Sequence, residues 1–333
     1  MFDIPVVLFL FKRSNTLEKI IERLRKVKPQ KIYLLADGAR NEEEINEIIK
    51  CRNLAEHLID WECQIIKNYA EKNKGVIENI GNGAKWVLKQ EPWAIFLEDD
   101  NLPEVSFFKF CKEMLIKYKD DNRIMWVCGT NYLGKYDTEY SYMFTRHLLP
   151  CGWASWSQKF LENYDIYLDT LKSDKKLNIF YNTYTSKRLL EQQIYSIKRT
   201  KYLIDKNKSK ASWDYQMLFS IRSNNLFGIS PSVNLIKNIG VDNYSIHGGN
   251  TFKNKMVQRF CGMNSYELIF PLKHPHKVEI DLVYEKKIGK ILLMPIKERI
   301  QRKIATMIKP ILGLNPYDSF REYISKNKMR RNF

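Results

Sequence analysis

Residues 93–100 read Trp-Ala-Ile-Phe-Leu-Glu-Asp-Asp, an apolar run that ends in three consecutive carboxylates. The run Trp93–Leu97 has the length and composition of a strand buried in a parallel sheet. Glu98, Asp99 and Asp100 repel one another at its end, so a compensating positive charge is expected beside them. Either a divalent cation or a lysine next to an acidic surface turn meets that need, and the spacing favours neither.

Four similar apolar runs lie in the first 130 residues, at Ile4–Phe11, Ile32–Ala36, Cys63–Ile66 and Ile124–Cys128. Segments with helical spacing separate them, and the first such segment carries Leu17, Ile20, Ile21 and Leu24. This alternation predicts an open α/β sheet, mostly parallel, with helices on both faces. The regularity then fades: Tyr132–Tyr142 predicts a loop and a hairpin, and residues 165–210 are basic and helical in pattern.

Two further polar groups follow neighbouring strands. Asp37-Gly38 follows the second run, where this pair is typical of a turn. Lys12 and Arg13 follow the first run, where a cation either meets phosphate oxygens or is simply solvated. Ligands of open α/β sheets bind beyond the carboxyl ends of the strands, so these groups and the acidic triplet converge on one candidate site. Oxygen ligands there suit Mg²⁺ or Mn²⁺.

The sequence lacks two common phosphate-binding motifs. There is no GxxxxGK[ST] segment, which excludes a P-loop. No GxGxxG follows a strand, and Gly81-Asn82-Gly83 lies within a helical pattern, so an enzyme that uses a nicotinamide cofactor is disfavoured.

Asp214 is a candidate general base. It lies between Trp213 and Tyr215 at a predicted helix start, and partial desolvation by the aromatic rings would raise its basicity. The same position suits a carboxylate that opposes the helix dipole. Trp153, in a segment rich in small residues, is by default a core or hairpin residue.

Composition narrows the class of protein. The chain has 333 residues, of which 13% are aromatic, and this excludes disorder. Its net charge is +17, and Tyr284–Phe333 carry 13 Lys and Arg against 4 Asp and Glu. A basic nucleic-acid-binding protein is therefore an alternative, although no helix-turn-helix, zinc-finger or RNP-type motif is present.

The cysteines and the apolar runs indicate the compartment. Six cysteines without a CxxC pair predict reduced thiols in the cytoplasm. Met1-Phe2-Asp3 lacks a basic patch before an apolar run, so no secretion signal is expected, and no run is long enough for a bilayer span.

Seven segments carry a family resemblance when taken in order: Pro5–Ser14, Leu35–Gly38, Asn73–Gly75, Phe96–Phe108, Gly152–Trp156, Trp213–Gln216 and Asn234–Gly240. Together they resemble bacterial nucleotide-sugar glycosyltransferases of the GT-A fold, of the type that builds surface polysaccharides. The triplet Glu98-Asp99-Asp100 is similar to the variant of the Asp-x-Asp motif in the Golgi N-acetylglucosaminyltransferase family.

The resemblance implies a donor site. Asp100 would bind Mn²⁺ or Mg²⁺ directly, while Glu98 and Asp99 would hold the ribose and the waters of the metal. Asp37 would hydrogen-bond the nucleotide base. The segments with Arg13 and with Asn73 and Gly75 would lie beside the nucleotide.

The resemblance also implies an acceptor side. Asp214 would be the catalytic base. As a separate hypothesis about the mechanism, an aromatic ring such as Trp153 or Trp213 would stack on a sugar face and exclude water. His247 would lie near the metal or the diphosphate, but Gly248-Gly249 follows it where a hydroxyl residue is expected, so a solvated loop histidine is equally compatible.

The implied reaction is metal-dependent transfer of a hexosyl or N-acetylhexosaminyl group, with inversion, from a nucleotide sugar. A UDP-sugar is the favoured donor, and a glycan or a lipid-linked molecule is the acceptor; no nucleic-acid partner is expected. A metal-dependent nucleotidyltransferase is the alternative enzyme, because it also needs carboxylates and a nucleotide site on an α/β sheet.

The expected catalytic domain covers residues 1–250, with a nucleotide-sugar-binding half (1–130) and an acceptor half (131–250) that includes the helical insertion. A basic, partly amphipathic helical extension covers residues 251–333. Within it, apolar residues recur at helical spacing at Ile296, Ile300, Ile304, Met307, Ile308 and Ile311. This helix predicts either peripheral contact with an anionic membrane, at the inner face of the cell membrane, or docking on the catalytic domain.

Overall fold

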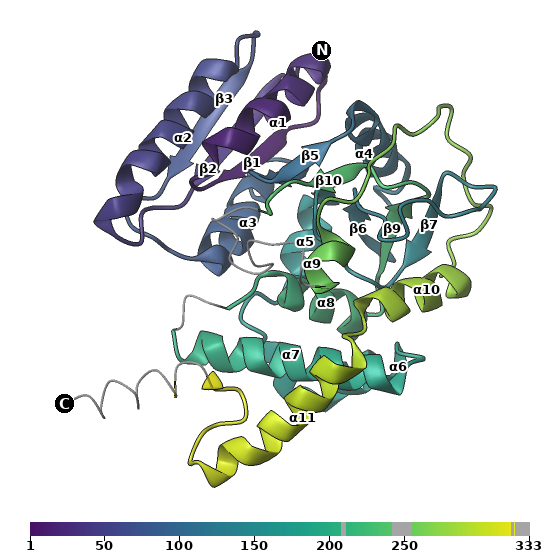
Figure 1. Ribbon diagram of the computed structural model, residues 1–333. Coiled ribbons are helices and arrows are strands. Elements are labelled where there is room, and N and C mark those ends of the chain that lie inside the picture. Colours follow the sequence, from purple (N-terminus) through teal and green to yellow (C-terminus); the bar gives the residue numbers. More distant parts are fainter. Residues whose placement is uncertain (208–210, 242–254, 321–322, 324–333) are drawn as a thin grey trace. The chain divides into compact units, whose positions relative to one another are not determined.

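A computed structural model describes residues 1–207, 211–241, 255–320 and 323 of the chain (Figure 1). The chain separates into two compact units, Met1–Ile291 and Leu292–Phe333. The first unit includes nearly all of helix α10 (Leu282–Leu292), whereas the expected catalytic domain ends at residue 250 and stays a prediction. No helix in the described part of the chain combines the length and apolar character of a membrane span.

Eight strands of the described residues form one sheet in the order β3-β2-β1-β4-β8-β6-β9-β7. Six of them run in one direction, and β8 and β7 run against the others. The strands are β1 (Val6–Leu10), β2 (Lys31–Ala36), β3 (Gln64–Tyr69), β4 (Trp93–Glu98), β6 (Ile124–Cys128), β7 (Tyr142–Thr145), β8 (Trp153–Trp156) and β9 (Phe227–Pro231). Each of the five strands expected before residue 130 overlaps an observed strand, and the predicted α/β class is confirmed.

A second, two-stranded antiparallel sheet pairs β5 (Asn101–Pro103) with β10 (Ile236–Asn238), directly after the end of β4. The α-helices of the described residues are α1 (Ser14–Val27), α2 (Ile45–Leu58), α3 (Gly83–Leu88), α4 (Val105–Lys117), α5 (Ser157–Asn163), α6 (Asp174–Asn182), α7 (Lys187–Asp205), α8 (Asp214–Ser223), α9 (Lys255–Phe260), α10 and α11 (Ile296–Ile311). Shorter helical turns are η1 (Glu42–Glu44), the π-helical η2 (Ile77–Asn82) and η3 (Asp169–Lys172).

Helices cover both faces of the sheet, as the apolar sequence of β1 predicts. On one face, Leu8 of β1 shares a core with Leu17 of α1 and Phe107 of α4. On the other face, a Cβ on Gly83 of α3 would lie 3.3 Å from the ring of Phe9. β1 is therefore buried along its whole length. Figure 1 shows α1 and α2 beside β1, β2 and β3.

Two glycines permit the close approach of η2 and α3 to their neighbours. Glycine disfavours a helix on propensity alone. However, a Cβ on Gly83 would lie 2.7 Å from Cδ2 of Leu35, and a Cβ on Gly81 would lie 2.9 Å from the hydroxyl of Tyr164. Glycine at both positions therefore lets this segment pack closely against β2 and the loop after α5 without displacing these side chains.

The hairpin expected in Tyr132–Tyr142 does not form. Tyr142 begins β7, which pairs antiparallel with β9 and aligns Met143 with Ser230. The partner strand comes from far along the chain, which a local sequence pattern does not reveal. Residues 165–210 contain α6 and α7, which pack Phe180 and Ile197 into a small core with Phe219 of α8.

A buried ion pair fastens α10 to the rest of the first unit. Arg222 of α8 is 1% exposed and donates to Glu285 of α10 at 2.8 Å and to Nδ1 of His147 at 3.2 Å. Because Nδ1 accepts, the proton of His147 lies on Nε2, which donates to the carbonyl of Glu285 at 3.0 Å. This contact explains why the first unit extends past residue 250.

Burial lowers the pKa of His147 to about 4, with the Arg222 charge acting in the same direction and Glu285 against it. Between pH 6.5 and 4 the unfolded chain therefore binds a proton that the folded chain does not, and the free energy of unfolding falls as the pH falls. We expect this residue to contribute up to about 1.4 kcal/mol per pH unit in that window. Urea unfolding of His147→Gln at pH 7, 6 and 5 should show a shallower loss than the wild type. The exposed His57→Gln is the control, and an unchanged slope in His147→Gln would contradict the prediction.

Candidate functional site

The acidic triplet and Arg13 meet where β4 and β1 end. The two strands are parallel neighbours that align Phe9 with Glu98, so the residues that follow each strand face one another. Nη1 of Arg13 donates to Oδ1 of Asp99 at 3.2 Å and to Oδ2 of Asp100 at 2.8 Å. The predicted convergence of these strand ends is therefore present, and one guanidinium binds two of the three carboxylates.

Asp99 is a buried anchor, with only 6% of its surface exposed. Its Oδ2 accepts the backbone N–H of Phe11 at 3.0 Å, and its carbonyl oxygen accepts the hydroxyl of Thr16 at the start of α1. Burial raises the pKa of Asp99 to about 6, against the lowering effect of the Arg13 charge. Asp99 thus fixes the loop that carries Arg13.

Asp100 is held by three different segments. Its Oδ1 accepts from Nδ2 of Asn101 at 2.6 Å, and its carbonyl oxygen accepts the N–H of Ile239 at 2.9 Å. A Cβ on Gly240 would lie 2.2 Å from Oδ2 of Asp100, so the backbone of Gly240 lies directly against the carboxylate. The carbonyl of Gly240 also accepts from Arg13, at 3.4 Å.

Glu98 lies among negative charges. It is partly buried, and within the described residues no hydrogen bond to its carboxylate is recorded. Burial raises its pKa well above the usual range, and the charges of Asp100 and Asp99 raise it further. The charge of Asp214 acts in the same direction, which places Asp214 within electrostatic reach of the triplet.

Asp214 is the first residue of α8, so it also occupies the helix-start position that its sequence suggests. Its Oδ1 accepts the N–H of Tyr215 at 3.0 Å. The carbonyl of the preceding Trp213 accepts the hydroxyl of Tyr164 at 3.1 Å. The negative charge of Asp214 contributes to the raised pKa of Tyr164 and of Tyr132, after burial. The fold therefore brings Asp214 and two buried tyrosines to the same side of the acidic triplet.

Asp37 is bound to the loop that follows β3. Its carboxylate accepts four hydrogen bonds, from the backbone N–H groups of Gly38 (2.8 Å), Lys74 (2.7 Å) and Gly75 (2.9 Å) and from Nδ2 of Asn73 (2.9 Å). A carboxylate offers about four acceptor positions. The carboxylate therefore holds the loop that follows β3, and the expected hydrogen bond to a nucleotide base stays a prediction.

Asn73 and Gly75 lie beside Asp37 because both donate hydrogen bonds to its carboxylate. Gly75 has a φ of +82°, a conformation that favours glycine, so that its N–H can point back at Asp37. Asn73 also donates to the carbonyl of Gly38 at 2.9 Å. The two residues are therefore brought together with Asp37, but by binding one another.

The ring of Trp153 is buried and is not available for the stacking role expected for it. Its ring is 1% exposed and stacks on Phe96 at 3.9 Å and on Trp126 at 4.2 Å between centroids, both at 15°. These rings come from β4 and β6, the strands on either side of β8. With both faces covered, the indole is part of the core and leaves no face for a sugar.

His247 lies outside the described residues. In the described part of the chain, no group of three His, Cys, Asp or Glu side chains is arranged to hold a metal ion. The donors present at the acidic triplet are carboxylate oxygens, two of which already accept from Arg13. They fit a hard cation such as Mg²⁺ or Mn²⁺ that takes one or two carboxylates and completes its shell with water and phosphate oxygens.

Several supporting residues escape a reading of the sequence. Asn101 binds both Asp100 and the N–H of Gly152, the latter at 2.8 Å, and Thr16 and Gly240 also contact the acidic residues. For Asn101 the sequence signal is its position next to the triplet. For Gly240 it is its position at the end of a segment that carries the family resemblance. Thr16 reads as an ordinary residue of a helix start.

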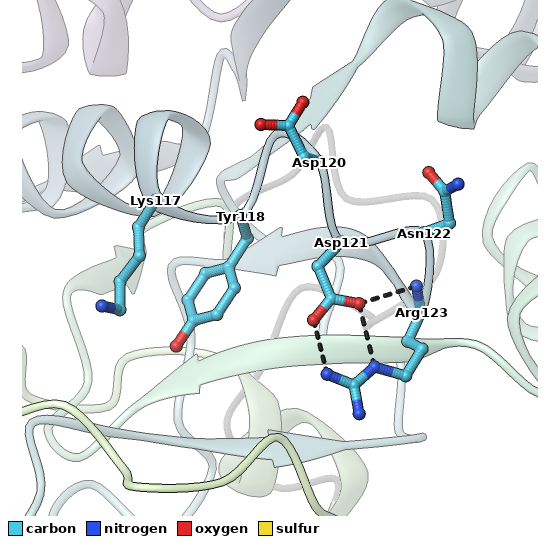
Figure 2. A pocket seen from close by; sticks show the side chains of 6 residues that line it. All are labelled: Lys117, Tyr118, Asp120, Asp121, Asn122 and Arg123. Atoms are coloured by element: carbon cyan, nitrogen blue, oxygen red, sulfur yellow. Dashed lines mark hydrogen bonds and ion pairs between the residues drawn. The ribbon is translucent and has the colours of Figure 1, made fainter.

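A shallow hollow lies elsewhere, at the turn between α4 and β6 (Figure 2). Asp121 and Arg123 face one another there in an ion pair of 2.7 Å, and Lys117 and Tyr118 lie beside them. This turn precedes β6, so it lies at the N-terminal edge of the sheet, opposite the acidic triplet. It contains no predicted site residue.

No protein-family profile and no curated protein matches the chain. Among solved structures, it is similar to glucosyl-3-phosphoglycerate synthase from Mycobacterium tuberculosis, solved with Mn²⁺, UDP and glucosyl-3-phosphoglycerate (13% identity, 47% of this chain and 57% of that chain, TM-score 0.28). It is also similar to TarS residues 1–349 of S. aureus (10%, 70% and 59%, TM-score 0.37) and to the glycosyltransferase GlyE of Streptococcus pneumoniae (12%, 92% and 64%, TM-score 0.33). A cytidylyltransferase and UDP-glucose pyrophosphorylase are further similar structures.

The chain spans less than two thirds of the length of each of these three proteins. The fold described here rests on the strand order and the two helical layers, and the function proposed below rests on the residues of the site.

The four hydrogen bonds to the Asp37 carboxylate are testable by their effect on the free energy of unfolding. Asp37→Asn replaces one acceptor oxygen with an amide that would face other donors, and we expect a loss of about 1–3 kcal/mol in the free energy of unfolding. Urea unfolding followed by tryptophan fluorescence measures it. The matched control is Asp137→Asn, at an exposed position. Equal stability of Asp37→Asn and the control would show that the four hydrogen bonds do not hold the loop.

Proposed function

We propose that this protein is a glycosyltransferase that uses a nucleotide-diphosphate sugar and Mn²⁺ or Mg²⁺. The observation that supports this is the position of Glu98, Asp99 and Asp100 at the end of β4, where the Arg13 guanidinium binds Asp99 and Asp100 and the charge of Asp214, far along the chain, acts on Glu98. Carboxylate oxygens at the carboxyl end of a parallel strand are the ligands that a hard divalent cation prefers, and such a cation also lets an anionic diphosphate approach.

Asp100 and Glu98 are the residues that would hold the cation. Bound there, the ion would stabilise the charge that develops on the leaving nucleoside diphosphate. Arg13 lies against Asp100 and the Gly240 carbonyl, so its guanidinium would be a positive group close to that charge. Asp99 keeps the Arg13 loop in place through Phe11, and Asp37 shapes the neighbouring wall of the donor site.

Asp214 is the proposed general base. It takes the proton from the acceptor hydroxyl as the hydroxyl oxygen forms a bond to the anomeric carbon. The bond from that carbon to the diphosphate oxygen breaks at the same time, and the electron pair leaves with the nucleoside diphosphate. Direct displacement of this kind inverts the configuration at the anomeric carbon. The buried Tyr164 and Trp213 fix the start of α8, which keeps Asp214 oriented.

The finer proposals concern the substrates and the compartment. We propose a UDP-sugar as donor, transfer of a hexosyl or N-acetylhexosaminyl group, and a glycan or lipid-linked acceptor in the synthesis of a surface polysaccharide. The six cysteines are all free thiols, which supports a reducing compartment, the cytoplasm.

The cation proposal predicts a loss of donor binding when the acidic site is altered. Asp100→Asn removes a negative ligand, and Gly240→Ala places a methyl group on the Asp100 carboxylate. We expect each to weaken UDP binding in the presence of Mn²⁺ at least about tenfold by calorimetry, a loss of about 1.4 kcal/mol. Gly228→Ala is the matched control, because a Cβ there meets only ordinary contacts, at 3.6 Å or more. Full transfer activity in excess EDTA would refute the proposal that transfer requires a divalent cation.

The base proposal predicts a different pattern. Asp214→Asn should leave the dissociation constant for UDP with Mn²⁺ unchanged and should lower turnover by a factor of about 100 to 10,000. Asp165→Asn is the control for a general effect of charge removal. The carboxylate of Asp165 accepts the N–H of Thr170 in η3 and has no proposed part in the reaction. Unchanged turnover in Asp214→Asn would assign proton removal to another group.

The reaction products separate this proposal from a nucleotidyltransferase. Sugar transfer releases a nucleoside diphosphate, whereas nucleotidyl transfer releases pyrophosphate. Phosphorus NMR of a reaction mixture distinguishes the two products directly.

A further inference from the structure

Helix α11 exposes a continuous apolar stripe along its length. Its members recur at helical spacing over 16 residues, which corresponds to about 24 Å of helix. The exposed fractions are 66% for Ile296, 53% for Ile300, 47% for Ile304, 66% for Met307, 41% for Ile308 and 82% for Ile311. Large apolar side chains that remain exposed in a row mark a surface that binds another apolar phase.

Basic residues flank the stripe. At about 100° per residue, Lys297 and Lys303 lie on opposite sides of its centre line, and both side chains are exposed. Arg299 lies farther round the helix on the Lys303 side, and Arg302 lies on the face opposite the stripe. The one acidic residue of α11, Glu298, lies on the opposite face. The apolar face therefore has a positively charged margin.

We propose that α11 binds the surface of an anionic membrane, with the isoleucine stripe among the acyl chains and the basic residues among the headgroups. The charge pattern favours this occupant, since anionic lipids attract the lysines while the acyl chains accept the isoleucines. At 16 residues with six charged side chains, the helix suits an orientation in the plane of the interface. This inference goes beyond the proposed transfer reaction and does not depend on it.

The direct test is co-sedimentation of the full chain with vesicles. Sucrose-loaded vesicles of phosphatidylcholine with 25% phosphatidylglycerol are compared with vesicles of phosphatidylcholine alone. We expect the partition coefficient to be at least about tenfold higher on the anionic vesicles, and to fall as salt is added, because salt screens the headgroup attraction.

Two double variants separate the contribution of the apolar stripe to vesicle binding from that of the lysines. Ile300→Gln with Ile304→Gln should lower the partition coefficient at least about tenfold, because the apolar contact is lost. The matched control is Ile269→Gln, at a position that is 84% exposed outside α11. Lys297→Gln with Lys303→Gln should lower binding to anionic vesicles by roughly fivefold per lysine. Lys119→Gln, at a side chain that is 59% exposed in the first unit, is the control for charge.

Circular dichroism and thermal unfolding establish that each variant folds, which is expected at exposed positions. The proposal is overturned if the wild type does not sediment with anionic vesicles, or if the double isoleucine variant sediments equally well. Sedimentation velocity then tests whether the stripe binds a second copy of the chain instead of a membrane. A wild type that dimerises through this stripe, with the Ile300/Ile304 variant monomeric and no vesicle binding, would assign the surface to a second copy of the chain.

Discussion

The contact between Arg13 and the carboxylates of Asp99 and Asp100 joins the two strand ends on which the site depends. β1 and β4 are parallel neighbours, so a cation that follows one strand is held against anions that follow the other. Glu98 has a raised pKa because burial and the charges of Asp100 and Asp99 disfavour its ionised form. The geometry of the sheet thus gathers carboxylates and a guanidinium at one edge.

The parts of the fold and site that local patterns encode were predictable from the sequence. Uniformly apolar segments such as Val6–Leu10 become strands covered on both faces, and the helical stripe of Leu17 and Ile20 faces the sheet. The position of the acidic triplet at the carboxyl edge of the sheet was predictable because a strand end in an α/β sheet has a known orientation. The pairing of Arg13 with the triplet follows from the same rule, once β1 and β4 are neighbours.

The roles of Asp37 and Trp153 were not predictable, because each depends on what distant segments place around the side chain. The loop after β3 fills the acceptor positions of Asp37, and strands β4 and β6 cover both faces of the Trp153 ring. Polar and aromatic residues near a site are ambiguous in sequence, since the same residue type serves as a ligand contact or as a packed partner. The unit boundary at residue 291 has a similar cause, the ion pair between Arg222 and Glu285.

The position of Asp214 shows how the core reaches the site. Trp213, the residue before it, packs at 5.8 Å from the ring of Trp153, in the aromatic layer below the sheet. At the other end of α8, Arg222 is bound to Glu285 of α10. The helix is therefore held at both ends by contacts that do not touch the acidic triplet. Because a helix of 10 residues is a stiff element, these two contacts fix where the Asp214 carboxylate lies relative to Glu98. A change in the core at either end of α8 would displace the carboxylate without altering any residue of the site itself.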